Sequence, residues 1–420
     1  MNEFRLITLD PGHFHAALIQ KEMYTGVANR VAVYAPLGPD LIEHLHRIAR
    51  FNLRPEHPTS WELDVHTGPD SLDRMLRERP GNIVVLSGRN RPKIHSIVRA
   101  LDAGFHVLAD KPWIIENVDL PWLEKAMAIA RNRGLVAYDI MTERFEITSM
   151  LQRELVNDPD IFGTIEPGTA DEPSVHMESV HHILKLVAGQ PNLRPPWFFD
   201  VNEQGEALAD VGTHLVDLVQ WTLFPESSID YRSDLAVLSA SGWPTPITSE
   251  QFGQVTGTPG AAVDYRCNTR VTYQIRGIHV KLDVLWRWEA PPGTGDTHHA
   301  VYRGSKSRIE VRQGPDEKYR PELYVVTAES AVRRALAHSI AKLAHRYPGI
   351  ALEERKTEVW VTIPDVYRVG HEAHFAQVTN QFFEYLRQPH SVPAWEDAYM
   401  LAKYYVSTKG VEVSRMPSAQ

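Results

Sequence analysis

Two stretches of the chain carry side chains that could move a proton and a hydride at a hydroxyl-bearing carbon. The first is AGFHVLADKP, residues 103–112, in which Lys111 follows a short apolar run that we expect to be a strand. An ammonium group at a strand end can hold a substrate hydroxyl and lower the pKa of a neighbouring acid. The following Pro112 restricts Lys111 toward extended backbone, which can fix the direction of its side chain. A surface lysine in a loop is the alternative.

The second stretch is GEALADVGTHLVDLVQW, residues 205–221, in which Asp210 and His214 are four residues apart. On a helix, that spacing places both side chains on one face. A carboxylate beside an imidazole can set its tautomer and raise its basicity. His214 could then take a hydroxyl proton while hydride leaves the same carbon. A helix cap by Asp210 with His214 in the core fits the spacing equally well.

The elements that would position Lys111 alternate between strands and helices over the first 142 residues. Such alternation predicts an α/β, doubly wound parallel sheet, which binds ligands beyond the carboxyl ends of its strands. Strands are expected at residues 6–9, 31–35, 83–86, 107–109 and 135–138, with helices at 72–79, 96–103 and 120–133. Residues 53–61, with two prolines, are expected to be a loop.

The first expected turn, DPGHFH at residues 10–15, keeps only part of a dinucleotide motif. Of G-x-G-x-x-G only Gly12 is present, because Asp10 and His15 replace the outer glycines. Asp10 brings negative charge to the place where phosphates approach, and Pro11 lacks an N–H donor. His13 and His15 form an H-x-H pair. Since loop histidines that only form hydrogen bonds are more common than metal ligands, no metal site is predicted.

Residues 143–420 are expected to form an α+β domain with a large open, mainly antiparallel sheet, because several segments alternate in hydrophobicity. Expected strands lie in residues 270–290, 305–314, 322–328 and 358–363. Expected helices are 143–160, 176–187, 208–223, 331–347, 374–386 and 396–407. On the helix expected at 176–187, His182 would share a face with Glu178 and Lys185. Residues 295–299 are expected in a hairpin.

These motifs resemble those of the Gfo/Idh/MocA oxidoreductases. AGFHVLADKP is similar to the family's A-G-K-H-V-x-x-E-K-P, and GEALADVGTHLVDLVQW is similar to G-G-x-x-x-D-x-G-x-H-x-x-D. The C-terminal region resembles a subgroup with a putative-oxidoreductase C-terminal domain. The resemblance implies a Rossmann-like dinucleotide-binding domain at 1–142 and a substrate-binding and oligomerisation domain at 143–420. It leaves open that the last helices pack back on the N-terminal domain.

The implied activity is NAD- or NADP-dependent hydride transfer at a hydroxyl carbon of a sugar, glycoside or polyol. The implied catalytic residues are Lys111, Asp210 and His214. The implied cofactor contacts are Gly12, His13, Phe14, Ser87, Asn90, Asp110 and Lys111. The implied substrate contacts are Arg144, His182 and Asp217. The resemblance also implies a homo-oligomer formed through the C-terminal sheet.

Composition excludes some other classes of protein. The net charge is −9 over 420 residues, without a basic stretch, so no nucleic-acid partner is expected. A single cysteine, Cys267, cannot form an internal disulfide. No run of 18 apolar residues and no signal peptide is found, so we expect a cytoplasmic protein without a membrane partner.

Two alternative functions stay open from the sequence. One is an NAD-dependent glycoside hydrolase that works by oxidation and elimination, without net production of NADH. The other is a non-catalytic sugar- or nucleotide-binding regulator, which the altered first turn would suit. The combination of Lys111, Asp210 and His214 argues against a regulator, since a sensor needs no acid/base pair.

Overall fold

The structure is a computed structural model that describes residues 4–187 and 190–416. The chain forms two compact units. The first unit contains the residues up to Thr142 together with Arg194–Gly205 and His371–Tyr404. The second contains Glu143–Leu193, Glu206–Gly370 and the residues from Tyr405. The return of Arg194–Gly205 to the first unit was not anticipated from the sequence.

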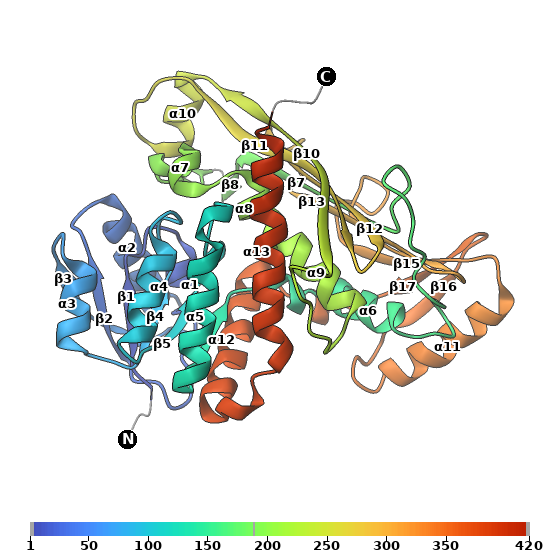
Figure 1. Ribbon diagram of the computed structural model, residues 1–420, viewed down its shortest axis with the longest axis horizontal. Coiled ribbons are helices and arrows are strands. Elements are labelled where there is room, and N and C mark those ends of the chain that lie inside the picture. Colours follow the sequence, from blue (N-terminus) through green and yellow to red (C-terminus); the bar gives the residue numbers. More distant parts are fainter. Residues whose placement is uncertain (1–3, 188–189, 417–420) are drawn as a thin grey trace. The chain divides into compact units, whose positions relative to one another are not determined.

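The first unit is built on a six-stranded parallel sheet in the order β3-β2-β1-β4-β5-β6, drawn in blue to green in Figure 1. Its strands are β1 Leu6–Leu9, β2 Arg30–Ala35, β3 Glu62–Thr67, β4 Ile83–Leu86, β5 His106–Ala109 and β6 Ala137–Asp139. Every residue of β1 and β4 is buried, as in a parallel sheet covered on both faces. The predicted doubly wound fold is confirmed.

Helices connect and cover these strands. They are α1 His15–Leu18, α2 Pro39–Leu53, α3 Ser71–Glu78, α4 Lys93–Asp102, α5 Leu120–Arg133, α7 Val201–Gln204, α12 His371–Arg387 and the first part of α13 Ala394–Ser414. The helix that follows the first turn, α1, has only four residues. The sequence prediction lacked α2, although Leu41, His44 and Ile48 are buried at helical spacing.

The second unit is built on a nine-stranded sheet in the order β10-β11-β12-β7-β13-β14-β15-β17-β16 (Figure 1). Its strands are β7 Val175–Leu184, β10 Leu235–Ile247, β11 Val263–Ile275, β12 Ile278–Glu289, β13 Thr297–Arg303, β14 Arg308–Arg312, β15 Glu322–Val326, β16 Ala351–Glu354 and β17 Glu358–Thr362. A separate pair joins β8 Leu186–Val187 to β9 Gln190–Pro191. Only β7 and β12 pair in parallel, so the predicted, mainly antiparallel sheet is confirmed.

The helices of the second unit are α6 Ile147–Val156, α8 Ala207–Asp210, α9 Gly212–Leu223, α10 Ser249–Thr256, α11 Ser330–Leu343 and the last part of α13. Short 3-10 turns elsewhere in the chain are η1 Asn117–Asp119, η2 Thr142–Phe145, η3 Pro196–Phe199, η4 Asp365–Tyr367 and η5 Pro389–Ser391. No helix in the described part of the chain is long and apolar enough to span a membrane.

Two expectations about the second unit were wrong. Residues 176–187 do not form a helix; most of them lie in β7, between β12 and β13. Because these residues form a strand, His182 shares no helix face with Glu178 and Lys185. The hairpin expected at residues 295–299 is also absent, because β7 lies between β12 and β13. The loop between β12 and β13 crosses the carboxyl end of β7 instead.

Candidate functional site

In the first unit, polar residues follow the carboxyl ends of four neighbouring strands. Asp10 follows β1, Ser87 follows β4, and Lys111 comes two residues after β5. Asp139 ends β6, where Lys403 Nζ lies 3.0 Å from its carboxylate. Since parallel strands end at a common edge, the fold gathers these groups where open α/β sheets bind ligands.

Asp110, the residue directly after β5, is the centre of this group. Its Oδ2 lies 3.2 Å from His13 Nδ1 and 2.9 Å from His15 Nδ1, and it accepts a hydrogen bond of 3.0 Å from Ser87 Oγ. Burial alone would raise the pKa of Asp110, but the two imidazoles hold it well below its usual range. Asp110 is therefore a buried carboxylate held by three side chains.

Lys93 is a buried residue of this edge that the sequence prediction missed. Its Nζ donates hydrogen bonds to Asn90 Oδ1 at 2.6 Å, to the Asp110 carbonyl at 2.9 Å and to the Pro112 carbonyl at 3.1 Å. The two carbonyl groups belong to the residues directly before and after Lys111. The peptide bond between Lys111 and Pro112 is cis. Lys93 thus fixes the backbone on both sides of Lys111. The sequence offered no signal other than a lysine just before the helix expected at residues 96–103.

Backbone N–H groups of the first turn are engaged by the protein itself. Asp10 N donates to the Tyr34 carbonyl, Gly12 N to the Asp10 carbonyl and His13 N to the Ser87 carbonyl, at 2.7–2.9 Å. Pyrophosphate in a G-x-G-x-x-G turn needs such donors. With only four residues in α1 to follow, this turn does not fit a pyrophosphate in the pose of that motif.

The space and the charge around Gly12 also disfavour a pyrophosphate in the pose of the G-x-G-x-x-G motif. A Cβ built on Gly12 would lie 3.1 Å from the Trp197 ring and 3.2 Å from the Asp40 carboxylate. Trp197 Nε1 donates to that carboxylate at 2.9 Å. Burial raises the pKa of Asp10, and neighbouring Asp40 and Glu203 raise it further, against the opposing charge of Arg89. The surroundings of the turn are thus filled and rich in carboxylates.

Segment 194–205 also covers residues predicted to contact a cofactor. Asn90 N and Arg91 N both donate to the Glu203 carbonyl at 3.1 Å, and Asn90 Nδ2 donates to the Gln204 carbonyl at 2.7 Å. Phe14 precedes α1, with Arg47 Cζ 5.5 Å from its ring centroid. Asn90 therefore anchors this segment within the first unit.

In the second unit, Asp210 and His214 lie on successive helices. Asp210 ends α8, His214 belongs to α9, and Val211 between them keeps helical angles, φ −74° and ψ −38°. The predicted four-residue spacing on a helical path is thus retained, although the helix is divided. Asp210 is 7% exposed, and its charge acts on His181 of β7.

Asp296, in the loop that crosses the end of β7, organises a second polar cluster. Its Oδ2 lies 3.1 Å from His181 Nδ1 and also pairs with Lys185 Nζ. Its Oδ1 accepts the His182 backbone N–H at 3.1 Å and lies 3.2 Å from His182 Nδ1. Burial alone would raise the pKa of Asp296, but the hydrogen bond from His181 and the charge of Lys185 lower it. Asp296 therefore remains a carboxylate.

His181 is the best-placed proton carrier of this cluster. Its Nε2 lies 2.7 Å from Ser179 Oγ, and its ring stacks on Trp286 with centroids 5.0 Å apart. Burial lowers the pKa of His181, and burial also lowers the pKa of the nearby His298 to about 4. A neutral imidazole held between a carboxylate and a hydroxyl can relay a proton. Sequence reasoning named His182 instead, because it assumed a helix.

Arg144 and Asp217, both predicted to contact substrate, contact each other. Arg144 Nε donates to Asp217 Oδ2 at 2.6 Å, and its Nη2 donates to Oδ1 at 2.7 Å. The side chains are 7% and 1% exposed, respectively. A buried bidentate ion pair joins η2 to α9, which favours a role in holding the fold.

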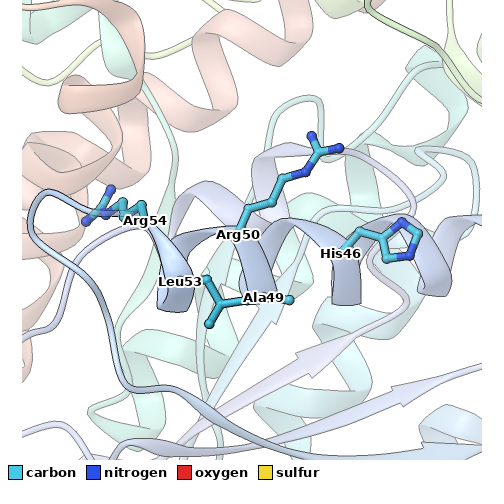
Figure 2. A pocket seen from close by; sticks show the side chains of 5 residues that line it. All are labelled: His46, Ala49, Arg50, Leu53 and Arg54. Carbon is cyan, nitrogen blue, oxygen red and sulfur yellow. The ribbon is translucent and has the colours of Figure 1, made fainter.

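A shallow pocket lies on α2. It is lined by His46, Ala49, Arg50, Leu53 and Arg54, which come from the helix and its C-cap (Figure 2). None of these residues was predicted to act in the site. Arg54 is fixed by a hydrogen bond from Nη2 to the Lys21 carbonyl. We assign the pocket no part in catalysis.

Comparison with known proteins agrees with this architecture. A crystal structure of a putative oxidoreductase from Parabacteroides merdae ATCC 43184 is 46% identical, with a TM-score of 0.96 over 99% of this chain and 98% of its own. Two solved structures share the fold at lower identity. KijD10, a 3-ketoreductase from Actinomadura kijaniata in complex with TDP-benzene and NADP, has a TM-score of 0.56 at 15% identity, covering 97% and 96% of the two chains.

The second is a levoglucosan dehydrogenase in complex with NADH and L-sorbose, with a TM-score of 0.63 at 12% identity over 98% of each chain. No curated protein matches the sequence. Residues 151–415 match the family described as "Putative oxidoreductase C terminal domain". The chain therefore belongs to this oxidoreductase family, of the Gfo/Idh/MocA type that its motifs predicted.

Proposed function

We propose that this protein transfers hydride between a hydroxyl carbon of a sugar, glycoside or polyol and NAD or NADP. The observation that carries the proposal is the placement of Lys111 at the carboxyl end of β5, in a sheet of order β3-β2-β1-β4-β5-β6. That strand order is the one in which dinucleotide-binding proteins hold their ligand beside β1 and β4. The family and the complexes of the more distant structures with NADP or NADH support it.

The ammonium group of Lys111 would stabilise negative charge on the substrate oxygen. Lys93 fixes the backbone on both sides of Lys111, which would hold that ammonium group in place. His214 would accept the hydroxyl proton, and Asp210 would keep His214 in its basic form. A bound nicotinamide would supply the hydride acceptor. Because the first turn does not fit pyrophosphate, the nucleotide would have to bind in a pose other than that of the G-x-G-x-x-G motif.

The cluster around Asp296 would hold the carbohydrate in the second unit. Lys185 and the histidines carry hydrogen-bond donors, which suit the hydroxyl groups of a sugar. Asp296 fixes these donors in place, so the direction of each donor would be set before substrate arrives.

The first test is the identity of any nucleotide bound to the purified protein. The protein is purified in its native state and then denatured to release bound small molecules, among which mass spectrometry should detect NAD or NADP. Calorimetry should then show which of the two rebinds. A panel of sugars and glycosides is then assayed by absorbance of the reduced nucleotide. Replacing His214 by Ala should abolish turnover and leave nucleotide affinity unchanged. Failure to bind either nucleotide would refute the proposal.

The same assay separates the alternatives. A glycoside that is cleaved without net reduction of nucleotide would indicate the oxidation–elimination reaction. Binding of sugar and nucleotide without any turnover would indicate a regulator.

We also propose that the protein forms a homo-oligomer through the second unit's sheet. Strand β10 is at the edge of the sheet, and Leu238 and Trp243 on it are 45% and 38% exposed. A long edge strand with exposed apolar side chains is a common site of strand or sheet association.

A further inference from the structure

The group around Asp110 has the composition of a metal site as well as of a hydrogen-bond network. One nitrogen each from His13 and His15 and one carboxylate oxygen from Asp110 all lie within 4.8 Å of one another. We propose that these three residues bind a divalent transition-metal cation, of which Zn²⁺ is the reference. The proposal does not depend on the hydride-transfer function.

The distances between the three groups suit a shared cation. His13 Nδ1 and His15 Nδ1 lie 3.2 Å and 2.9 Å from Asp110 Oδ2. The centroids of the two imidazole rings are 4.1 Å apart. Ligands of a tetrahedral Zn²⁺ lie about 2.0–2.2 Å from the ion, which puts them roughly 3.3 Å from one another. Small side-chain rotations would therefore bring all three ligands onto one ion.

The second oxygen of Asp110, the buried Oδ1, is the second, independent observation. Oδ2 faces two imidazole nitrogens and the Ser87 hydroxyl, while the buried Oδ1 has no hydrogen-bond partner in the described part of the chain. Asp110 is only 3% exposed. A buried carboxylate usually satisfies both oxygens, because an unsatisfied one costs free energy. A cation bound by both oxygens of the carboxylate would satisfy Oδ1 as well.

The ligand types indicate which cations would bind. Two imidazoles and one carboxylate suit Zn²⁺, Fe²⁺ or Mn²⁺, whereas Mg²⁺ prefers oxygen ligands alone. His371 stands beside the ligands, with its ring centroid 5.7 Å from that of His15, and we place it outside the set of ligands.

The site would also account for the altered first turn. In the G-x-G-x-x-G pattern the last glycine relieves crowding, but here that position is His15, whose side chain points to Asp110. The turn that no longer fits pyrophosphate instead presents two imidazoles to one carboxylate.

The experiment uses the full-length protein, stripped with a chelator and dialysed, with no nucleotide or sugar added. Zn²⁺ is titrated by calorimetry, and Co²⁺ is added as a spectroscopic probe of imidazole coordination. We expect one Zn²⁺ per chain and visible Co²⁺ absorption, with no Mg²⁺ binding under the same conditions. Because nucleotide and sugar are absent, the result is separate from the test of the proposed oxidoreductase function.

Variants then place the ion. His13→Gln should weaken Zn²⁺ affinity at least about 10-fold, and Asp110→Asn should do the same. His46→Ala, which removes an exposed histidine of the first unit, serves as the matched control and should bind as the wild type does. His13 is the most exposed ligand, so its variant should stay folded by circular dichroism even if Asp110→Asn does not. Absent Zn²⁺ binding, equal binding of Mg²⁺, or unchanged affinity in folded His13→Gln would each overturn the proposal.

Discussion

At the scale of single residues, three side chains of the second unit contact Asp296: those of His181, His182 and Lys185. The sequence placed Asp296 only in an expected hairpin and did not indicate its partners. Asp296 is 114 positions from His182, and its contacts depend on the crossing of β7 by the loop before β13. The histidines were visible in the sequence, yet their partner could only be found once β7 was known to be a strand.

Replacing Asp296 by Asn tests this arrangement. The variant removes the charge that holds Lys185 and His181, and hydrogen bonds to charged groups contribute about 1.5–3 kcal/mol. We expect kcat/KM for the sugar to fall about 10- to 100-fold, mostly through KM, in steady-state kinetics. Glu289→Gln, an exposed change near the same end of β12, should leave kinetics unchanged. An unaltered KM in Asp296→Asn would contradict the assigned role.

Asp10 has a positive φ of 47° and a carboxyl whose pKa is raised by burial. A raised pKa in the folded state means that this carboxyl favours folding below its unfolded pKa, and that the benefit is lost as pH rises through the folded pKa. Asn adopts the same backbone region without a charge to bury. Asp10→Asn should therefore be more stable than the wild type at pH 7, and the gain should disappear near pH 4.

Urea unfolding at several pH values measures this difference. The exposed Asp171→Asn serves as the control and should show no such trend. A variant that is less stable than the wild type at pH 7 would show that the Asp10 charge is favourable in the folded protein.

At the scale of elements, the predicted helices and strands agree with the structure where the local apolar pattern in the sequence is strong. The helix predicted at residues 120–133 is α5, Leu120–Arg133, and the strand predicted at 83–86 is β4, because both have strong apolar patterns. Strand β3 was missed because it is a partly exposed edge strand of sequence ELDVHT. Strand β7 was mistaken for a helix because paired strands on both sides, distant in sequence, decide its conformation.

The loop after β4 depends on a glycine that no motif required. A Cβ on Gly88 would lie 2.3 Å from the Asp10 carbonyl oxygen, so two backbone segments approach too closely for any side chain. Gly88→Ala should cost about 1–3 kcal/mol in urea unfolding. Gly38→Ala is the matched control, since no atom lies within 4 Å of its Cβ position. Equal stability of the two variants would show that the turn moves apart without cost.

The ion pair between Arg144 and Asp217 belongs to the same scale. Asp217→Asn removes the bidentate carboxylate from a buried guanidinium and should destabilise the protein by about 3–5 kcal/mol. Replacing both residues, as Arg144→Met with Asp217→Leu, should recover much of that loss because no charge stays buried. Thermal and urea unfolding measure both variants. A mild effect in Asp217→Asn that comes with a large rise in KM would favour substrate contact instead.

At the scale of the whole molecule, the exposed strand β10 allows a direct test of the proposed oligomer. Trp243→Glu places a charge on an apolar position of the edge strand, which disfavours pairing with a second copy. We expect light scattering after size exclusion to show a smaller species for the variant than for the wild type. A monomeric wild type, or an unchanged mass in the variant, would contradict association through β10.

The first unit is assembled from three separate stretches of chain, and its last stretch is α12 with the start of α13. A ribosome releases this last stretch only after residues 1–370 have been synthesised. During translation, the buried face of α12, including Phe375, Val378 and Phe382, is therefore missing from the unit it completes. The N-terminal region must wait, partly open to chaperones and proteases, until His371–Tyr404 has been synthesised.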